Sequence, residues 1–234
     1  MQEPNTNSRV RSPATTVRYL ATLSHALSVA EREWGWLDDS PMRKVRKPTE
    51  PRGRVRFLND DERNQLLQAC RNSNNYKLYP IVVLAISTGM RQGEILNLRW
   101  PDVDLKTGFA ILHETKNGER RRVPIIGHSL DELREYAKVR RLDSDLVFPG
   151  ETGKPAEIRR PWLAALTEAG IDDFRFHDLR HTAASYLAMN GATPGEIAEV
   201  LGHKTLAMVK RYAHLSENHV RNTVAAMNSR IFGE

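Results

Sequence analysis

One segment of this chain of 234 residues departs from the helical spacing of apolar residues, and this segment limits the folds open to the chain. On both sides of it, apolar residues recur at intervals of three and four, which is typical of amphipathic helices. Between them, residues 103–105, 109–113 and 120–125 form short runs that are typical of strands. Asn117 and Gly118 join the last two runs, and an Asn-Gly pair between strands is a strong hairpin signal. The sequence therefore predicts a mainly α fold with one small antiparallel β-sheet (α+β).

Two segments carry the pattern of a capping box, in which a short polar side chain and an acid three residues later bond each other's backbone N–H groups. Asn59 and Glu62 predict one helix start, and Ser129 and Glu132 predict another. Both pairs precede apolar residues at helical spacing, as a helix start requires.

The first quarter of the chain divides into three parts. Residues 1–15 are polar with almost nothing to bury, which predicts a disordered tail. Residues 16–40 carry one apolar stripe at helical spacing, and a single helix cannot bury such a stripe alone. Residues 41–57 combine prolines and a glycine with basic residues, which predicts a basic linker. Residues 58–234 are expected to form the larger domain.

The charge of the chain favours a polyanionic partner without identifying one, because 35 Lys and Arg against 29 Asp and Glu give a net charge of +6. The basic residues gather in two runs, and such runs are either solvated surface or a nucleic-acid contact. The residues that we expect to contact DNA are Arg43, Lys44, Arg46, Lys47, Arg52, Arg54, Arg56, Arg120, Arg121 and Arg122.

Cys70 is the single cysteine, so an internal disulfide is impossible and a reducing compartment is expected. It lies in an apolar helical stretch and is predicted to be a core residue. No apolar run is long enough to span a bilayer, and the amino terminus has no apolar h-region. The sequence thus predicts a soluble, cytoplasmic protein with no membrane partner.

His177 and Arg180 are the first candidates for chemistry. Three residues apart on a helix, they share one face. A guanidinium offers a rigid fork of donors for phosphate oxygens, and an imidazole exchanges a proton near neutral pH. His177 and His181, four residues apart, could also bind a metal. The glutamate of a zinc-protease helix is missing and no cysteine cluster supports a site, so no metal or cofactor is expected.

Four further residues have little meaning alone but gain meaning as a set. Arg91 precedes a short helix, where Glu94 could hold it through an i, i+3 pair. Lys116 lies at the tip of the predicted hairpin, where its ammonium could protonate a departing oxygen. His203 precedes Tyr212 by nine residues. A phenol, with a pKa near 10, is a poor nucleophile unless cations or a base assist it.

The ordered set of Arg91, Lys116, His177, Arg180, His203 and Tyr212, with the triplet Leu-Gly-His at 201–203, resembles the tyrosine recombinases, or phage integrases. The resemblance spans about residues 55–220. It implies that Tyr212 attacks a DNA phosphate to give a 3′-phosphotyrosine and a free 5′-hydroxyl, without metal or ATP.

The resemblance also implies a role for each companion of Tyr212. Arg91 and Arg180 hold the non-bridging phosphate oxygens. Lys116 is the general acid for the leaving oxygen. His177 accepts the proton of Tyr212, and His203 adds a donor to the phosphate. The reaction would be site-specific recombination, for integration or excision of a phage or mobile element.

The partners implied by the resemblance are double-stranded DNA and further copies of the chain, which is expected to be a monomer when free and a tetramer on paired DNA sites. Accessory proteins that set direction or bend DNA are further candidates. Residues 16–40 are expected to be a remnant of a truncated core-binding domain. Residues from about 215 to 234 resemble a tail helix that docks on a neighbouring protomer or packs back on its own chain.

Three other functions remain open at this point. A helix-turn-helix regulator fits residues 194–214, but it gives Arg91 and Lys116 no purpose. A type IB topoisomerase would use the same chemistry without exchange of partner strands. A protein scaffold built on the stripe of residues 16–37 would have little affinity for DNA. Covalent capture of DNA by Tyr212 separates the catalytic functions from the binding functions.

Overall fold

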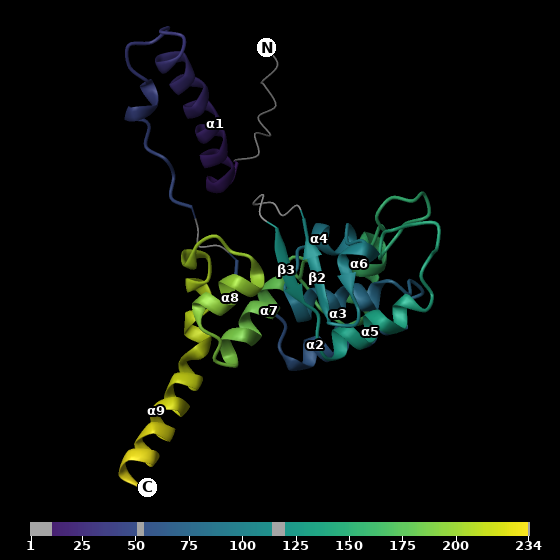
Figure 1. Cartoon of the computed structure of the whole chain (residues 1–234). Coiled ribbons are helices and arrows are strands. Elements are labelled where there is room, and N and C mark those ends of the chain that lie inside the picture. Colours follow the sequence, from purple (N-terminus) through teal and green to yellow (C-terminus); the bar gives the residue numbers. More distant parts are fainter. Residues whose placement is uncertain (1–10, 51–53, 114–119, 234) are drawn as a thin grey trace, which may run out of the picture. The chain divides into compact units, whose positions relative to one another are not determined.

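Helices make up most of the structure, a computed structural model that describes residues 11–50, 54–113 and 120–233 (Figure 1). The chain forms two compact units, residues 1–54 and residues 55–234. The first unit contains α1 (Pro13–Arg32) and η1 (Pro41–Lys44). The second contains α2 (Asp60–Asn72), α3 (Leu78–Thr88), α4 (Gln92–Leu96), η2 (Trp100–Asp102), β1 (Val103–Asp104), β2 (Phe109–Leu112), β3 (Arg121–Pro124), α5 (His128–Ala137), α6 (Arg159–Glu168), α7 (Asp178–Met189), α8 (Pro194–Leu201), η3 (Leu206–Met208), η4 (Lys210–Ser216) and α9 (Glu217–Phe232).

Helix α1 begins at Pro13, within the segment predicted to be a disordered tail. Ser12 caps it, because its hydroxyl accepts a hydrogen bond from the Thr15 N–H at 3.2 Å. A proline in the first turn suits a helix start, since its missing N–H would have no partner there. The helix ends at Arg32, and η1 gives a short turn of helix to the segment predicted to be a linker.

Helix α3 forms the centre of the second unit. Its residues from Leu78 to Ala85 are all buried, as a helix that is apolar on every side requires. Helices α2, α5 and α7 pack against it, and α6 packs on α2. Cys70 of α2 faces this core at 1% exposure, and its burial raises the pKa of the thiol to about 12. The prediction that Cys70 is a core residue is confirmed.

The small antiparallel sheet has the strand order β1-β2-β3. Ala110 pairs with Val123 across β2 and β3, and both side chains are buried. The predicted fold class, mainly α with a small antiparallel sheet, is confirmed. The predicted hairpin tip, with Lys116, Asn117 and Gly118, lies outside the described residues.

One of the two predicted capping boxes forms. The Glu62 N–H donates to Asn59 Oδ1 at 2.8 Å, and the Asn59 N–H donates to Glu62 Oε2 at 3.0 Å. The box at Ser129 is wrong. Helix α5 begins at His128, two residues before the start that a cap at Ser129 would give, and Gly127 precedes it at a φ of 56°. Ser129 therefore lies in the first turn, and its hydroxyl donates to the Ile126 carbonyl at 2.8 Å.

The last third of the chain forms a second apolar cluster and then a projecting helix. Residues of α7, α8 and η4 build the cluster, among them Ala184, Leu201 and Tyr212. Helix α9 extends away from them (Figure 1), and its apolar side chains are exposed, Val224 by 47% and Ile231 by 62%. Within the described ranges, no helix is both long and apolar enough to cross a bilayer.

Candidate active site

Arg180 joins the ends of two helices to α7. Its Nη1 donates to the Gly89 carbonyl at 2.6 Å, and its Nη2 donates to the Leu201 carbonyl at 2.5 Å. Gly89 ends α3 at a φ of 62°, a left-handed conformation that suits glycine. Burial, followed by the charges of Arg91 and Arg121, lowers the pKa of Arg180 to about 10. The guanidinium is therefore fixed in place and still charged at neutral pH.

Glu94 holds two arginines from different elements. Arg91 donates from Nη1 to Glu94 Oε1 at 2.6 Å, and its backbone N–H donates to Oε2 at 2.8 Å. Arg121 of β3 donates from Nη2 to the same Oε2 at 3.1 Å. The Glu94 side chain is only 7% exposed, so the carboxylate is fixed between the two guanidinium groups. The predicted i, i+3 pair between Arg91 and Glu94 is confirmed.

Arg121 differs from its two basic neighbours in sequence. Its side chain is 12% exposed, whereas Arg120 and Arg122 are exposed, and the Arg122 guanidinium lies 3.5 Å from the centre of the Phe109 ring. Strand alternation explains the difference, because Arg121 points to the same side as the buried Val123. Arg121 lies against the backbone of Gly202, where an added Cβ would come within 2.1 Å of Nη1. Burial lowers the pKa of this guanidinium from its usual range.

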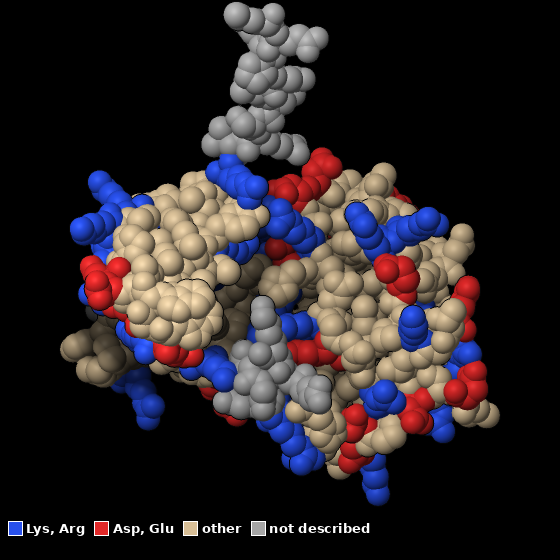
Figure 2. Space-filling model, turned by 90° about the horizontal axis from the view of Figure 1, so that it is seen from above, with Lys and Arg blue, Asp and Glu red and all other residues tan. Residues whose placement is uncertain are grey.

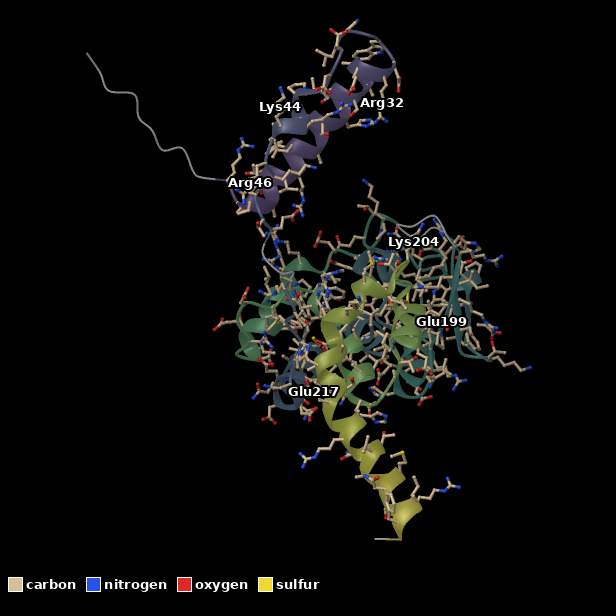
Figure 3. All side chains as sticks on the ribbon, turned by 90° about the vertical axis from the view of Figure 1, so that its left-hand side faces the viewer. Arg32, Lys44, Arg46, Glu199, Lys204 and Glu217 are labelled. Carbon is tan, nitrogen blue, oxygen red and sulfur yellow. The ribbon has the colours of Figure 1, made fainter. Side chains whose placement is uncertain are left out.

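His203 follows the glycine that ends α8. Gly202 has a φ of 64°, and the His203 N–H donates to the Ala198 carbonyl at 2.8 Å, which closes the helix. Its buried Nδ1 has no hydrogen-bond partner within the described part of the chain. Burial, followed by the charges of Arg180 and Arg91, lowers the pKa of His203 to about 4. The ring is neutral at neutral pH. Glu199 and Lys204 lie on the exposed side of this turn (Figure 3).

Tyr212 is buried in η4 at 2% exposure, and its hydroxyl is hydrogen-bonded to His181 Nδ1. Burial raises the pKa of the phenol above its usual value, while the charges of Arg211 and Arg180 act in the opposite direction. Burial and the nearby His177 lower the pKa of His181 to about 4. The phenol thus meets a neutral imidazole.

His177 immediately precedes α7, and its ring stands edge-on to the ring of His181 with the centroids 5.7 Å apart. From the sequence, His181 is a candidate only for binding a metal. Its position, four residues after His177 and next to Arg180, is the signal that could have added it to the site. Spacing alone could not tell which imidazole meets Tyr212.

The contacts bring together five of the six predicted catalytic residues. Arg180 donates to the carbonyls of Gly89 and Leu201, which lie close in sequence to Arg91 and His203. His181, the next residue, is hydrogen-bonded to Tyr212. Lys116, the sixth, lies outside the described residues. Arg91 and Arg121 hold the Glu94 carboxylate, and Arg180, Arg211 and the buried Asp178 act on His181. Four arginines therefore outnumber these two carboxylates in the described part of the site, which suits an anion. Across the described ranges, no group of three or more His, Cys, Asp and Glu could hold a metal ion.

The predicted DNA contacts differ in their surroundings. Lys44 and Arg46 (Figure 3) and Lys47 are exposed in the first unit, where Arg43 pairs with Glu31 at 2.7 Å. Arg56 of the second unit donates from Nη1 to Glu62 Oε2 at 2.9 Å. Arg54 is half-buried, and Arg52 lies outside the described residues. Figure 2 shows Lys and Arg spread over much of the visible face, with Asp and Glu among them. Charge alone therefore does not locate a binding surface.

Comparison with known proteins identifies the family. The chain is 32% identical to the integrase of Salmonella phage P22 over 99% of its own length and 62% of that protein, and 39% identical to a shufflon-specific DNA recombinase of Escherichia coli over 89% and 54%. It spans less than two thirds of either relative. The crystal structure of XerA recombinase matches 92% of the chain and 83% of its own, at a TM-score of 0.64 and 25% identity. Residues 56–219 match the phage integrase family model, and the chain therefore belongs to the phage integrase family.

Proposed function

We propose that this chain is a site-specific recombinase that cleaves and rejoins DNA strands through a 3′-phosphotyrosine intermediate, during integration or excision of a phage or mobile element. Membership of the phage integrase family supports the proposal. So does the 39% identity to a shufflon-specific DNA recombinase of Escherichia coli.

The observation that carries the proposal is the convergence of four separate segments on one buried tyrosine. Arg180 bonds the carbonyls of Gly89 and Leu201, close to Arg91 and His203, and the adjacent His181 bonds the Tyr212 hydroxyl. The contact between Arg180 and the Gly89 carbonyl joins residues that lie 91 positions apart in the sequence. A structural tyrosine needs no such ring of cations, whereas a phosphate-attacking tyrosine does.

In the proposed reaction, Arg91 and Arg180 hold the non-bridging oxygens of the scissile phosphate, and His203 donates a further hydrogen bond. These donors are fixed before DNA binds, so they stabilise charge that develops in the transition state without reorganisation. The Tyr212 oxygen then forms a bond to phosphorus while the bond to the 5′ oxygen breaks. Lys116 gives the leaving oxygen its proton. The 5′-hydroxyl of a partner strand reverses the step and exchanges the strands.

Helix α9 supports a further part of the proposal, assembly of several protomers on paired DNA sites. Its apolar residues Val220, Val224, Met227 and Ile231 follow helical spacing, and all are exposed by about half. Packing of this face on another molecule would remove it from water. We therefore propose that α9 contacts a neighbouring protomer in the DNA-bound assembly and that the free chain is a monomer.

Covalent capture of DNA tests the proposed function. The substrate is a nicked duplex carrying the DNA that flanks the gene, on which cleavage releases a short strand end and the covalent product accumulates. We expect an SDS-resistant protein–DNA band from the parent chain and none from Tyr212→Phe. Tyr186→Phe is the matched control, because it removes a hydroxyl that bonds Asp60 and lies outside the site. That variant should give the parental band.

Any of three results would contradict the proposal. DNA binding without any covalent band would favour a regulator or another binding protein. A covalent band that survives in Tyr212→Phe would mean that another residue attacks the phosphate. Relaxation of supercoiled DNA without exchange of strands would instead support a topoisomerase.

A further inference from the structure

The Tyr212 hydroxyl has a partner that the ordered family residues do not include. His181 Nδ1 is hydrogen-bonded to the phenol oxygen, and the two ring centroids lie 6.0 Å apart. We infer that His181 is the general base of cleavage, which accepts the proton that Tyr212 loses as its oxygen attacks phosphorus. This inference rests on the proposed function and replaces His177 in that role.

The contact joins the two atoms between which the proton would pass. A neutral imidazole carries its proton on one ring nitrogen and accepts through the other. In the tautomer with its proton on Nε2, the neutral ring accepts the hydrogen bond of the Tyr212 hydroxyl at Nδ1. The transfer then runs along an existing hydrogen bond, without movement of either ring.

Burial and nearby charges keep the ring neutral in the free chain. Burial, followed by His177, Arg211 of η4 and Arg180 of α7, lowers the pKa of His181 to about 4, while Asp178 acts in the opposite direction. A bound phosphate would add negative charge opposite Arg180. An anion near an imidazole raises its pKa, so the ring becomes a stronger base when DNA is bound.

The proton balance of the step is complete. The proton of the Tyr212 hydroxyl moves to His181 Nδ1, and the electron pair left on the phenol oxygen forms the bond to phosphorus. The bond from phosphorus to the 5′ oxygen breaks, and Lys116 protonates that oxygen. In the reverse direction His181 returns its proton to Tyr212. In this scheme His177 contributes to the phosphate site together with His203.

Two substitutions separate a base from a residue that only positions the phenol. In His181→Asn, the amide oxygen lies near the position of Nδ1, so it can accept the hydrogen bond but cannot take the proton. His181→Ala removes both functions. We expect both variants to lose about 10²–10⁴-fold in the rate of covalent product formation, the usual contribution of a general base. His214→Asn is the matched control, an exposed histidine two residues beyond Tyr212.

A substrate with sulfur in place of the leaving 5′ oxygen separates the base from the acid. A thiolate leaves without a proton, so this substrate should restore cleavage to Lys116→Ala. It should not restore cleavage to His181→Asn, because the tyrosine must still lose its proton.

The pH dependence on the sulfur substrate gives a readout that a structural role would not change. His181 is neutral in the free chain above about pH 4 and in the DNA complex above a higher pH. The rate of the parent should therefore level off within the range from about pH 6 to 9 and vary little in its upper part. In His181→Asn the phenol must ionise unaided. Because its pKa is raised, the rate should increase about tenfold per pH unit across that range.

The outcomes distinguish this inference from the proposed function. Three results together support His181 as the base. Cleavage by His181→Asn is slow, the sulfur substrate does not restore it, and its rate depends on pH where that of the parent does not. Parental rates in His181→Asn, or a loss that sulfur restores, would overturn the inference while the proposed function stands. Absence of any Tyr212-dependent product from the parent chain would contradict the proposed function itself.

Discussion

The buried cationic site and the basic segment of residues 43–47 contain the same kinds of side chain, but these side chains differ in exposure and in how firmly they are held. Arg180 and the Arg121 side chain are 5% and 12% exposed, and backbone carbonyls or Glu94 fix their positions. Lys44 and Arg46 are exposed (Figure 3). Fixed donors can stabilise a transition state, because they need no reorganisation. Exposed, screened charges supply affinity for the DNA backbone instead. We therefore expect the two regions to control different quantities, the cleavage rate and the binding constant.

The largest effect is expected from Arg180→Ala. The change removes a phosphate donor, which should slow cleavage at saturating DNA by roughly 10²–10³-fold. It also leaves the carbonyls of Gly89 and Leu201 without their partner, at a cost of about 1–3 kcal/mol of folding stability for each. Single-turnover cleavage and urea unfolding measure the two effects. Near-parental cleavage would remove Arg180 from the site.

A smaller loss is expected from Arg121→Gln, because Arg121 acts on the phosphate through Glu94 and Arg91. Release of Glu94 should misplace Arg91 and slow cleavage by up to about 10²-fold. Arg122→Gln on the same strand should weaken DNA binding and leave the cleavage rate at saturation unchanged. Equal cleavage rates in the two variants would contradict the distinction between buried and exposed arginines.

Acid should destabilise the buried site. His181 and His203 have a pKa of about 4 when folded and 6.5 as the ordinary value, so the unfolded chain binds more protons between these values. Stability from these groups is present above about pH 6.5 and is lost as the pH falls toward 4. We expect the Tm of the parent to fall over this range, and that of a His181→Asn, His203→Asn double variant to fall less. An equal fall of Tm with pH in the parent and in the double variant would show that neither histidine is buried in neutral form.

The smallest effect is expected from Lys44→Gln and Arg46→Gln. Each should weaken DNA binding modestly and reduce the slope of log affinity against log salt by about one. Cleavage at saturating DNA should not change. A salt titration of binding, run beside single-turnover cleavage, checks both statements. A cleavage defect at saturation would mean that the segment takes part in the chemistry.

Local signals predicted much of the fold. The box of Asn59 and Glu62 forms because the interaction involves only four consecutive residues. The box at Ser129 fails because α5 begins at His128, after Gly127 at a φ of 56°, which places Ser129 inside the first turn. Helix α1 begins before its predicted start because Ser12 and Pro13 form a cap that the argument from apolar spacing did not consider.

The site was predictable as a set of residues and less so as a set of contacts. The order of Arg91, His177, Arg180, His203 and Tyr212 indicated one phosphate site. Two contacts could not be read from spacing, because both depend on tertiary packing. One is the choice of His181 as the partner of Tyr212, which requires the position of η4 against α7. The other is the hydrogen bond from Arg121 to Glu94. Strand alternation indicates only that Arg121 points to the same side as Val123, unlike Arg120 and Arg122.

Identification of the residue that becomes attached to DNA tests the central claim most directly. The covalent product from the nicked duplex would be digested with protease and nuclease, and the modified peptide sequenced by mass spectrometry. We predict a nucleotide attached through a 3′ phosphate to Tyr212, in the peptide that contains the Val-Lys-Arg-Tyr sequence of residues 209–212. Attachment to any other residue would contradict the proposal that the four converging segments serve Tyr212 as the nucleophile.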